Sequence, residues 1–155
     1  MNLNELSEQL KKLFSSQRLA VLATQGIDEP YVNLVAFATT HDLKYLVFAT
    51  NRHTRKFTNL TERPDAAFLI DNRTNKVTDF TESMAVTAMG SVQEVNASER
   101  DHLMKLYLTK HPTLREFVTS ADCALLKTII RAYYVVTNFQ NVMELDVESW
   151  SLSSG

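Results

Sequence analysis

Three short apolar segments lie close together in the first third of the chain, and only brief turns separate them. The segments span 19–23, 31–39 and 45–50, with turns at 25–30 and 40–42. Their β-branched and aromatic residues are typical of strands, and connections this short allow antiparallel neighbours but no helical crossover. The spacing therefore predicts an antiparallel sheet rather than a parallel α/β unit.

Four further strands are expected downstream of this group. They are the apolar runs 65–70, 84–95, 125–136 and 142–147. Gly90 lies inside the second of these runs and indicates a bulge or a sharp bend. Six or seven closely spaced strands, with no repeat and no low-complexity tract, favour a small antiparallel barrel.

Helical spacing and capping residues predict helices outside this barrel. Leucines and a phenylalanine over 3–14 fall on one face of an amphipathic helix. Thr54 can cap a short helix that ends before Pro64. Ser98 is the expected N-cap of a longer helix, and 113–119 adds another turn or two. The fold class is therefore mainly β, with about four outer helices.

The whole chain of 155 residues is expected to form a single domain. Its parts are an N-terminal helix (1–16), a barrel core with a basic loop (17–95), a helical insert (98–120) and closing strands (124–147). The polar stretch 71–81 within the core is expected to be a loop.

Charge and cysteine content limit the partners and the compartment. The net charge is −2, so no global attraction to nucleic acid or to an anionic membrane is expected. No apolar stretch is long enough for a membrane span, and the N-terminus lacks the pattern of a signal peptide. The single cysteine, Cys123, is expected to be a buried thiol, and a cytoplasmic location follows as the expectation.

The usual catalytic residue sets are missing from the sequence. The four histidines have no metal-binding spacing, and three glycines cannot build a phosphate-cradling loop. No serine lies in a nucleophile-elbow pattern. His41, His102 and His111 are therefore expected to be ordinary exposed residues, and no metal site is expected.

Segment 49–56 is the exception, since it joins a strand end to a helix start and is basic. Arg52, Arg55 and Lys56 place three positive charges within five residues. Further donors in the segment are Thr50, Asn51 and Thr54. A helix N-terminus adds free N–H groups and a positive dipole end. The pattern fits a phosphate-monoester site and, equally, a solvated basic helix start.

The preceding hairpin favours a larger ligand at this loop. Strands 30–38 and 45–51 are expected to pair, so the basic loop directly follows their hairpin. A planar aromatic ligand with a phosphate tail could lie along the barrel wall. Its ring would meet the backbone of 33–35, and its phosphate would meet 54–56.

Several motifs then occur in the order found in a known family. They are Pro30-Tyr31, Val47-Phe48-Ala49-Thr50-Asn51, Thr54-Arg55-Lys56, and Asn59-Leu60 through Pro64. With these motifs the chain resembles the FMN-binding split-barrel family related to pyridoxamine 5′-phosphate oxidase, over about residues 17–95. The resemblance implies a Greek-key-like split barrel of six or seven antiparallel strands.

The resemblance also implies a cofactor site. Family members are homodimers that bind two FMN molecules at the subunit interface. The residues implied to bind FMN are Asn33, Leu34, Val35, Ala49, Thr50, Asn51, Thr54, Arg55 and Lys56. By this likeness Arg55 and Lys56 pair with the phosphate, and Thr54 donates to it.

The same resemblance also implies which residues contact the rest of the cofactor. Thr50 and Asn51 would line the phosphate and ribityl region, and 33–35 would meet the flavin ring largely through backbone groups. The partner chain would close the site, with Trp150 as a candidate contributor. Strands that are apolar on both faces, 84–92 and 129–136, are consistent with a homodimer.

The chain departs from the true oxidases at several positions. Asn33 and Ala38 stand where the oxidases have arginine and lysine, and Ala85 stands where they have a glutamine for the flavin. Their C-terminal substrate motif is missing after Arg131. The phosphate-binding half of the pattern is kept and the pyridoxamine-phosphate half is not, which argues against vitamin B6 oxidation.

The expected function is an FMN-binding flavoprotein, an oxidoreductase on an unidentified small molecule or electron donor. A non-catalytic flavin-storage dimer is the alternative. Haem and a deazaflavin are less favoured ligands. Haem is disfavoured because no histidine lies in the barrel-wall segments to ligate it, whereas a deazaflavin would use a similar groove to FMN. His53 is the only candidate acid or base beside the basic loop.

Overall fold

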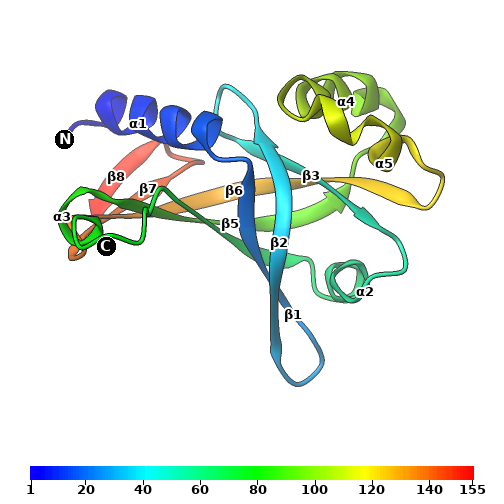
Figure 1. The fold of residues 1–155 in the computed structure, drawn as a ribbon, viewed down its shortest axis with the longest axis horizontal. Helices are drawn as coiled ribbons and strands as arrows, with labels where there is room; N and C mark the ends of the chain where they lie inside the picture. Colours follow the sequence, from blue (N-terminus) through cyan, green and yellow to red (C-terminus); the bar gives the residue numbers. More distant parts are fainter.

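The computed structural model describes residues 1–155 and contains one eight-stranded antiparallel sheet. The strands are β1 (Leu19–Gln25), β2 (Pro30–Thr39), β3 (Tyr45–Asn51), β4 (Asp65–Asp71), β5 (Met84–Glu94), β6 (Cys123–Thr137), β7 (Asn141–Asp146) and β8 (Ser151–Ser154). Their order is β3-β2-β1-β4-β5-β6-β7-β8, and a further pairing of β3 with β6 closes the first six into a barrel. The expected mainly-β barrel is therefore confirmed, and β7 and β8 extend it at one side (Figure 1).

Five α-helices surround the barrel. They are α1 (Leu3–Ser16), α2 (Arg55–Glu62), α3 (Asp79–Glu82), α4 (Ala97–Lys110) and α5 (Arg115–Thr119), with a 3-10 turn at Pro112–Leu114. α3 is a single turn at the end of the stretch that was expected to be a loop. β8 lies in the polar tail, where no strand was expected, and it pairs with β7.

Side-chain caps fix where the helices begin. The Thr54 hydroxyl accepts a hydrogen bond from the N–H of Phe57, as its predicted capping role requires. The prediction of Ser98 as the cap of α4 is wrong. Asn96 is the cap, because its side chain and that of Glu99 form a reciprocal capping box. Ser98 lies in the first turn and donates to the Asn96 side chain.

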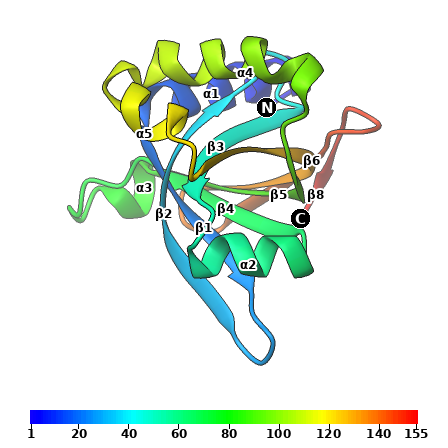
Figure 2. The same cartoon turned by 90° about the vertical axis from the view of Figure 1, so that its right-hand side faces the viewer.

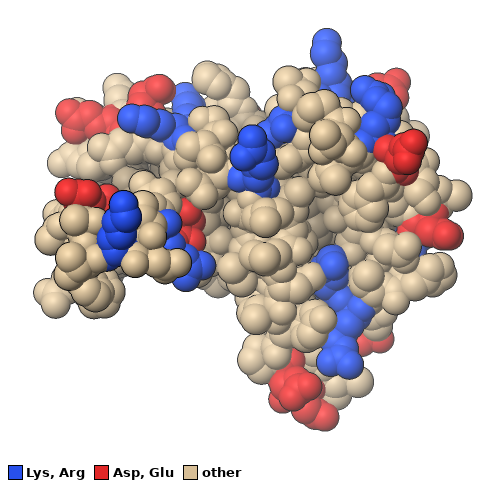
Figure 3. All heavy atoms as spheres, in the orientation of Figure 1, with Lys and Arg blue, Asp and Glu red and all other residues tan.

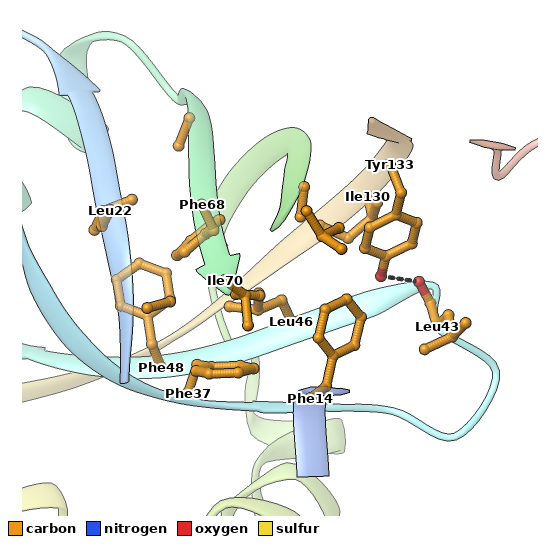
Figure 4. Packing of buried hydrophobic residues seen from close by; sticks show 14 of the residues in the cluster. Phe14, Leu22, Phe37, Leu43, Leu46, Phe48, Phe68, Ile70, Ile130 and Tyr133 are labelled. Atoms are coloured by element: carbon orange, nitrogen blue, oxygen red, sulfur yellow. Dashed lines mark hydrogen bonds between the residues drawn. The ribbon is translucent and has the colours of Figure 1, made fainter. Parts of the chain in front are cut away.

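Aromatic side chains fill the barrel and seal the end covered by α1. Phe14 of α1 points into the barrel, with its ring centroid 5.6 Å from that of Tyr133 and 6.2 Å from that of Phe37 (Figure 4). The Tyr133 hydroxyl donates to the Leu43 carbonyl at 2.6 Å. Burial raises the pKa of Tyr133, so this phenol stays protonated and bonded. No polar side chain is left without a partner among these groups.

A second apolar cluster lies outside the barrel, beneath α4 and α5. The two helices cover the outer side of β3 and the N-terminal part of β6 (Figure 2). Cys123 is buried in this cluster, which confirms its prediction as a structural thiol. The prediction that His111 is exposed is wrong, because it lies at the end of α4 with Nε2 2.7 Å from the Phe37 carbonyl oxygen.

Gly90 marks the bend that its position predicts. The register between β5 and β6 shifts between Met89 and Gly90, which leaves Arg131 as the extra residue on β6. A side chain at Gly90 would collide with the Ile129 carbonyl. The bulge therefore needs glycine, and it turns β6 away from β3 toward β7.

The opposite outer side of the barrel is apolar and partly exposed. Outward-facing residues of five adjacent strands form three register-matched rows, which we call the bare face: Val21, Ala23, Val32, Leu34, Ala67, Leu69, Ala85, Thr87, Met89, Tyr134 and Val136. Leu34 is 62% exposed and Val32 is 61% exposed. Figure 3 shows a broad area with few charged side chains across the centre of the molecule. Contiguous apolar patches on a protein surface are typical of interaction sites.

Candidate functional site

β2 and β3 part at the end of the barrel that α2 covers. Their pairing runs only from Phe37 opposite Phe48 to Thr39 opposite Leu46. The first half of β2 pairs with β1 alone, and the last residues of β3 pair with β6 on their other side. The hairpin of β1 and β2 extends past the barrel beside α2 (Figure 1). The two strands predicted to flank a ligand therefore separate where the basic loop begins.

Inward-facing polar groups lie at this end of the barrel. Asn33 of β2 and Thr50 of β3 share the inner side with the core residues Phe37 and Phe48. Thr50 is fully buried, and the Oδ1 atom of Asn33 is buried with no hydrogen-bond partner. An unpaired buried amide oxygen costs about 1–3 kcal/mol. Asn33 thus presents an acceptor that a ligand donor can satisfy.

The loop between β3 and α2 is held by its own side chains. The Thr54 hydroxyl donates to the Asn51 carbonyl at 2.8 Å and lies 3.0 Å from the Thr50 hydroxyl. The Asn51 side chain accepts from the N–H of His53 at 2.8 Å. Thr54 was expected to donate to a phosphate, but its hydrogen is already used within the loop. Thr50, Asn51 and Thr54 therefore shape the loop.

The first turn of α2 offers free donors and two cations. The backbone N–H groups of Arg55 and Lys56 make no hydrogen bond within the chain. Neither side chain forms an ion pair with a carboxylate. The Arg55 guanidinium lies 5.2 Å from the centroid of the Tyr31 ring. Free N–H groups at a helix start, with unpaired cations beside them, are a suitable site for a phosphate.

Lys56 is the more desolvated of these two cations. Burial lowers the pKa of Lys56, because the charged ammonium loses hydration without gaining an anion. A bound phosphate would reverse this shift. The half-buried ammonium of Lys56 therefore has no anionic partner within the chain.

Arg52 does not belong to this cation group, contrary to its place in the predicted cluster. Its guanidinium donates to both carboxylate oxygens of Glu94, at 2.6 and 2.9 Å. This bidentate pair lowers the pKa of Glu94 and neutralises the charge of Arg52. His53 is an exposed side chain 3.8 Å from the carboxylate of Asp122 and points to solvent rather than into the barrel.

The side chains of three of the nine predicted residues lie outside this group. Leu34 points outward onto the bare face. The Ala49 side chain is buried beneath α4, and Val35 belongs to the barrel core. Trp150, between β7 and β8, packs against the barrel core and shares no pocket with the basic loop. The structure thus brings Asn33 and residues 50–56 to one end of the barrel, and leaves the other three to act through backbone or interface.

Two contributors, Tyr31 and Asn59, were noted in the sequence only as parts of motifs, without a role of their own. The Tyr31 ring supports Arg55. Asn59 of α2 donates to the Thr24 hydroxyl of β1 at 3.0 Å, and both side chains are buried. This bond fixes α2 to the barrel. The sequence did contain a signal for this bond, because Asn59 is a polar residue at a helix position where apolar residues are usual.

The closed barrel, the parted strands and the helix-capped basic loop together define a split-barrel protein. The family model described as pyridoxamine 5′-phosphate oxidase matches residues 6–136. The chain belongs to this family. Comparison with curated proteins gives no match.

Solved structures share the fold at low identity. A haem-binding protein from Mycobacterium smegmatis has a TM-score of 0.82 at 15% identity, with 93% of this chain and 59% of that chain covered. A protein from Clostridium acetobutylicum related to general stress protein 26 has a TM-score of 0.74 at 12% identity, with 97% and 100% covered. A FAD-binding protein from Mesorhizobium loti has a TM-score of 0.66 at 13% identity, with 83% and 90% covered. The chain thus spans only part of the first of these proteins and nearly all of the other two.

Two further observations complete the description of the site. The structure contains no cluster of three or more histidine, cysteine, aspartate or glutamate side chains that could hold a metal ion. None of its helices is both long enough and apolar enough to cross a membrane.

Proposed function

We propose that this protein binds FMN at the α2 end of the barrel and is an oxidoreductase for a small molecule. The observation that carries the proposal is the set of unsatisfied groups gathered there. These are the Asn33 Oδ1 atom, two free backbone N–H groups and two unpaired cations. Each is a partner that the phosphate, ribityl chain or ring of FMN could satisfy.

Different residues of the site would contact different parts of FMN. Arg55 and Lys56 would hold the phosphate with their side chains and backbone N–H groups. Asn33 would accept a hydrogen bond from the ribityl chain or the ring, and Thr50 and Asn51 keep the loop in place. Membership of the pyridoxamine 5′-phosphate oxidase family and the likeness to a FAD-binding protein both support a flavin.

FMN, when bound, supplies two-electron redox chemistry, and the protein supplies position and environment. No side-chain acid or base lies inside this end of the barrel, because His53 is exposed. The protein's own residues therefore bind and orient. Protons would come from water or from the substrate.

Haem is a weaker candidate for this chain. Haem iron requires an axial ligand such as histidine. His111 is buried and bonded to a carbonyl, while His41, His53 and His102 are exposed on loops or on a helix surface. No histidine faces the barrel end that holds the unsatisfied groups.

The bare face supports the proposal of a homodimer with the cofactor at the subunit interface. Leu34 belongs to this face while its neighbour Asn33 points inward toward the proposed site. A second copy covering the bare face would therefore also lie against the strand that borders the flavin. The chain has a low net charge, and its only cysteine is a buried free thiol. We therefore propose that the dimer is cytoplasmic.

The first experiment is purification followed by an absorption spectrum and mass analysis of any released chromophore. The double variant Arg55→Ala/Lys56→Ala should weaken FMN binding by about 1.5–3 kcal/mol for each charge removed, measured by fluorescence titration. The matched control is Arg52→Ala, which removes a cation already paired with Glu94. Equal FMN affinity in the double variant and wild type would overturn the site.

Addition of NADH or NADPH without air separates an enzyme from a flavin store. Bleaching of the bound flavin supports a reductase. A flavin that these donors never reduce, in a protein that binds it tightly, supports storage instead.

The dimer is tested at the centre of the bare face. Leu69→Lys places a charge among apolar neighbours on β1 and β5 and should convert the dimer to a monomer. Sedimentation or light scattering measures the mass. An unchanged dimer in Leu69→Lys would show that the subunits meet elsewhere.

A further inference from the structure

A cleft of about 640 Å³ lies on the barrel wall away from the α2 end. It opens where β6 stops pairing with β3 and begins to pair with β7. The N–H of Ile130 donates to the Lys44 carbonyl at 2.9 Å, while the N–H of Val147 donates to the Arg131 carbonyl at 2.9 Å. The bulge at Arg131 thus separates the turn before β3 from the turn after β7. The cleft therefore results from the change in strand pairing at this bulge.

The two turns that border the cleft are held in place. The Asp42 carboxylate accepts from the Thr40 hydroxyl at 2.6 Å and from the N–H of Lys44 at 3.0 Å. Asp146 accepts from both the N–H and the hydroxyl of Ser149 at 2.8 Å. Trp150 follows this second turn with a φ of 52°. Bulky residues rarely adopt this conformation, so the turn holds the indole in place at a cost.

Aromatic and aliphatic side chains form the walls and floor of the cleft. Trp150 and Tyr45 are the aromatic lining residues, and Ile129 is 44% exposed within it. The Lys127 ammonium lies 5.2 Å from the centroid of the Tyr45 ring. A cleft of this size with an apolar lining and a few polar groups suits a small ring-bearing molecule.

The charges around the cleft are balanced in sign. Lys44 and Arg131 are positive, and Asp42 and Glu148 are negative. No two of these four form an ion pair with each other. Arg131 makes only a long contact, at 3.8 Å, with an exposed Asp65. Because the four charges cancel, a ligand with a single charge gains little, whereas a ligand with both signs can satisfy both pairs.

We propose that this cleft binds a small aromatic zwitterion, such as an aromatic amino acid. Its ring would lie against Trp150 and Ile129. Its carboxylate would face Lys44, and its ammonium would face Asp42 and Glu148. This site is independent of the proposed flavin site, since it shares no residue with the α2 end of the barrel.

Trp150 is the only tryptophan in the chain, so its fluorescence reports on this cleft directly. The probe is 4-nitro-L-phenylalanine, whose nitroaromatic ring quenches indole emission. Matched probes with the same ring are 4-nitrophenylacetate, 4-nitrophenethylamine and 4-nitrobenzyl alcohol, which carry a negative, a positive and no charge. Calorimetry on the same full-length protein gives a second readout where a bound chromophore dims the emission.

The zwitterion should quench with saturation and bind about tenfold more tightly than each of the other three probes, a difference equivalent to about 1.4 kcal/mol. Lys44→Ala and Glu148→Gln should each reduce this preference several-fold. The control is Lys105→Ala, an exposed lysine on α4 outside the cleft. Circular dichroism checks that each variant is folded.

Three results would overturn the proposal. The first is quenching that never saturates, and the second is equal affinity for all four probes. The third is an unchanged preference in both Lys44→Ala and Glu148→Gln. Failure here leaves flavin binding untouched, because that is measured at the flavin's own absorbance.

Discussion

The two ends of the barrel are both covered by a helix, yet they differ in chemistry. At the α1 end, Phe14 packs against Phe37 and Tyr133, and the Tyr133 hydroxyl has a partner. At the α2 end, Asn33 has an unpaired oxygen and the first turn of the helix has free N–H groups. The polar groups described at the α1 end have partners within the chain, whereas several of those at the α2 end have none.

Lys110 at the α1 end and Lys56 at the α2 end differ in the same way. Burial lowers the pKa of both Lys110 and Lys56. Lys110 lies near the C-terminus of α1, where its ammonium donates to the Phe14 carbonyl at 2.8 Å and lies 3.7 Å from the centroid of the Phe37 ring. Lys56 has no such partners. Lys110 is desolvated but has partners within the chain, whereas Lys56 is desolvated without them and is therefore a candidate contact for a ligand.

The largest expected effect is the loss of packing at the α1 end. Phe14→Ala should lower the free energy of unfolding by about 3–5 kcal/mol, because it leaves a cavity between Phe37 and Tyr133. Urea denaturation measures the change, with the exposed Lys12→Ala as control. FMN affinity should stay unchanged in the folded fraction. A loss below about 1 kcal/mol would contradict the view that this end carries the stability.

A smaller effect concerns pH. Burial lowers the pKa of Lys110 to about 8, from an ordinary value of 10.5. Between these values the unfolded chain binds more protons than the folded one, so stability should rise with pH from 8 to 10.5. The slope from one proton is at most about 1.4 kcal/mol per pH unit. Lys110→Met should remove this component from the denaturation profile. Identical profiles would show that Lys110 titrates normally.

At the α2 end, Asn33→Leu should separate stability from binding. Replacing the unpaired amide by an apolar side chain should stabilise the ligand-free protein by about 1 kcal/mol. The same change should weaken FMN, because the acceptor is lost. Denaturation and flavin titration are measured together on one preparation. Loss of stability in this variant would mean that Asn33 already has a structural role.

The smallest effect is a spectroscopic one. Adding FMN, or inorganic phosphate at high concentration, should raise the pKa of Lys56 and leave that of Lys110 unchanged. Carbon-13 NMR of dimethylated lysines follows both groups in one sample. Equal responses of the two lysines would remove the distinction drawn between the ends.

Local features of this molecule were readable from sequence. The capping role of Thr54 and the bend at Gly90 depend on a few neighbouring residues and are confirmed. The antiparallel order of the first three strands was also predictable, because the turns between β1, β2 and β3 are too short for other connections. Asn96 was missed as a cap because Ser98 looked equally suitable, and only the reciprocal bond with Glu99 distinguishes them.

Contacts between distant segments were not readable. Glu94 at the end of β5 neutralises Arg52, and no local sequence pattern predicts this ion pair because the two residues are far apart in the chain. His111 is buried because α4 packs on the barrel and brings it to the Phe37 carbonyl. β8 escaped detection because a serine-rich segment has weak strand preference and owes its pairing to β7. In each case tertiary structure overrides the local signal.

The pairing of β3 with β6 has a consequence for how the chain folds. Tyr45 meets Ile129, so the barrel cannot close until most of the chain has left the ribosome. Until then β3 and β5 each present an open edge, which is a template for pairing with other chains. We therefore expect closure by β6 to be the late, slow step of folding, and chains that stop before Cys123 to aggregate.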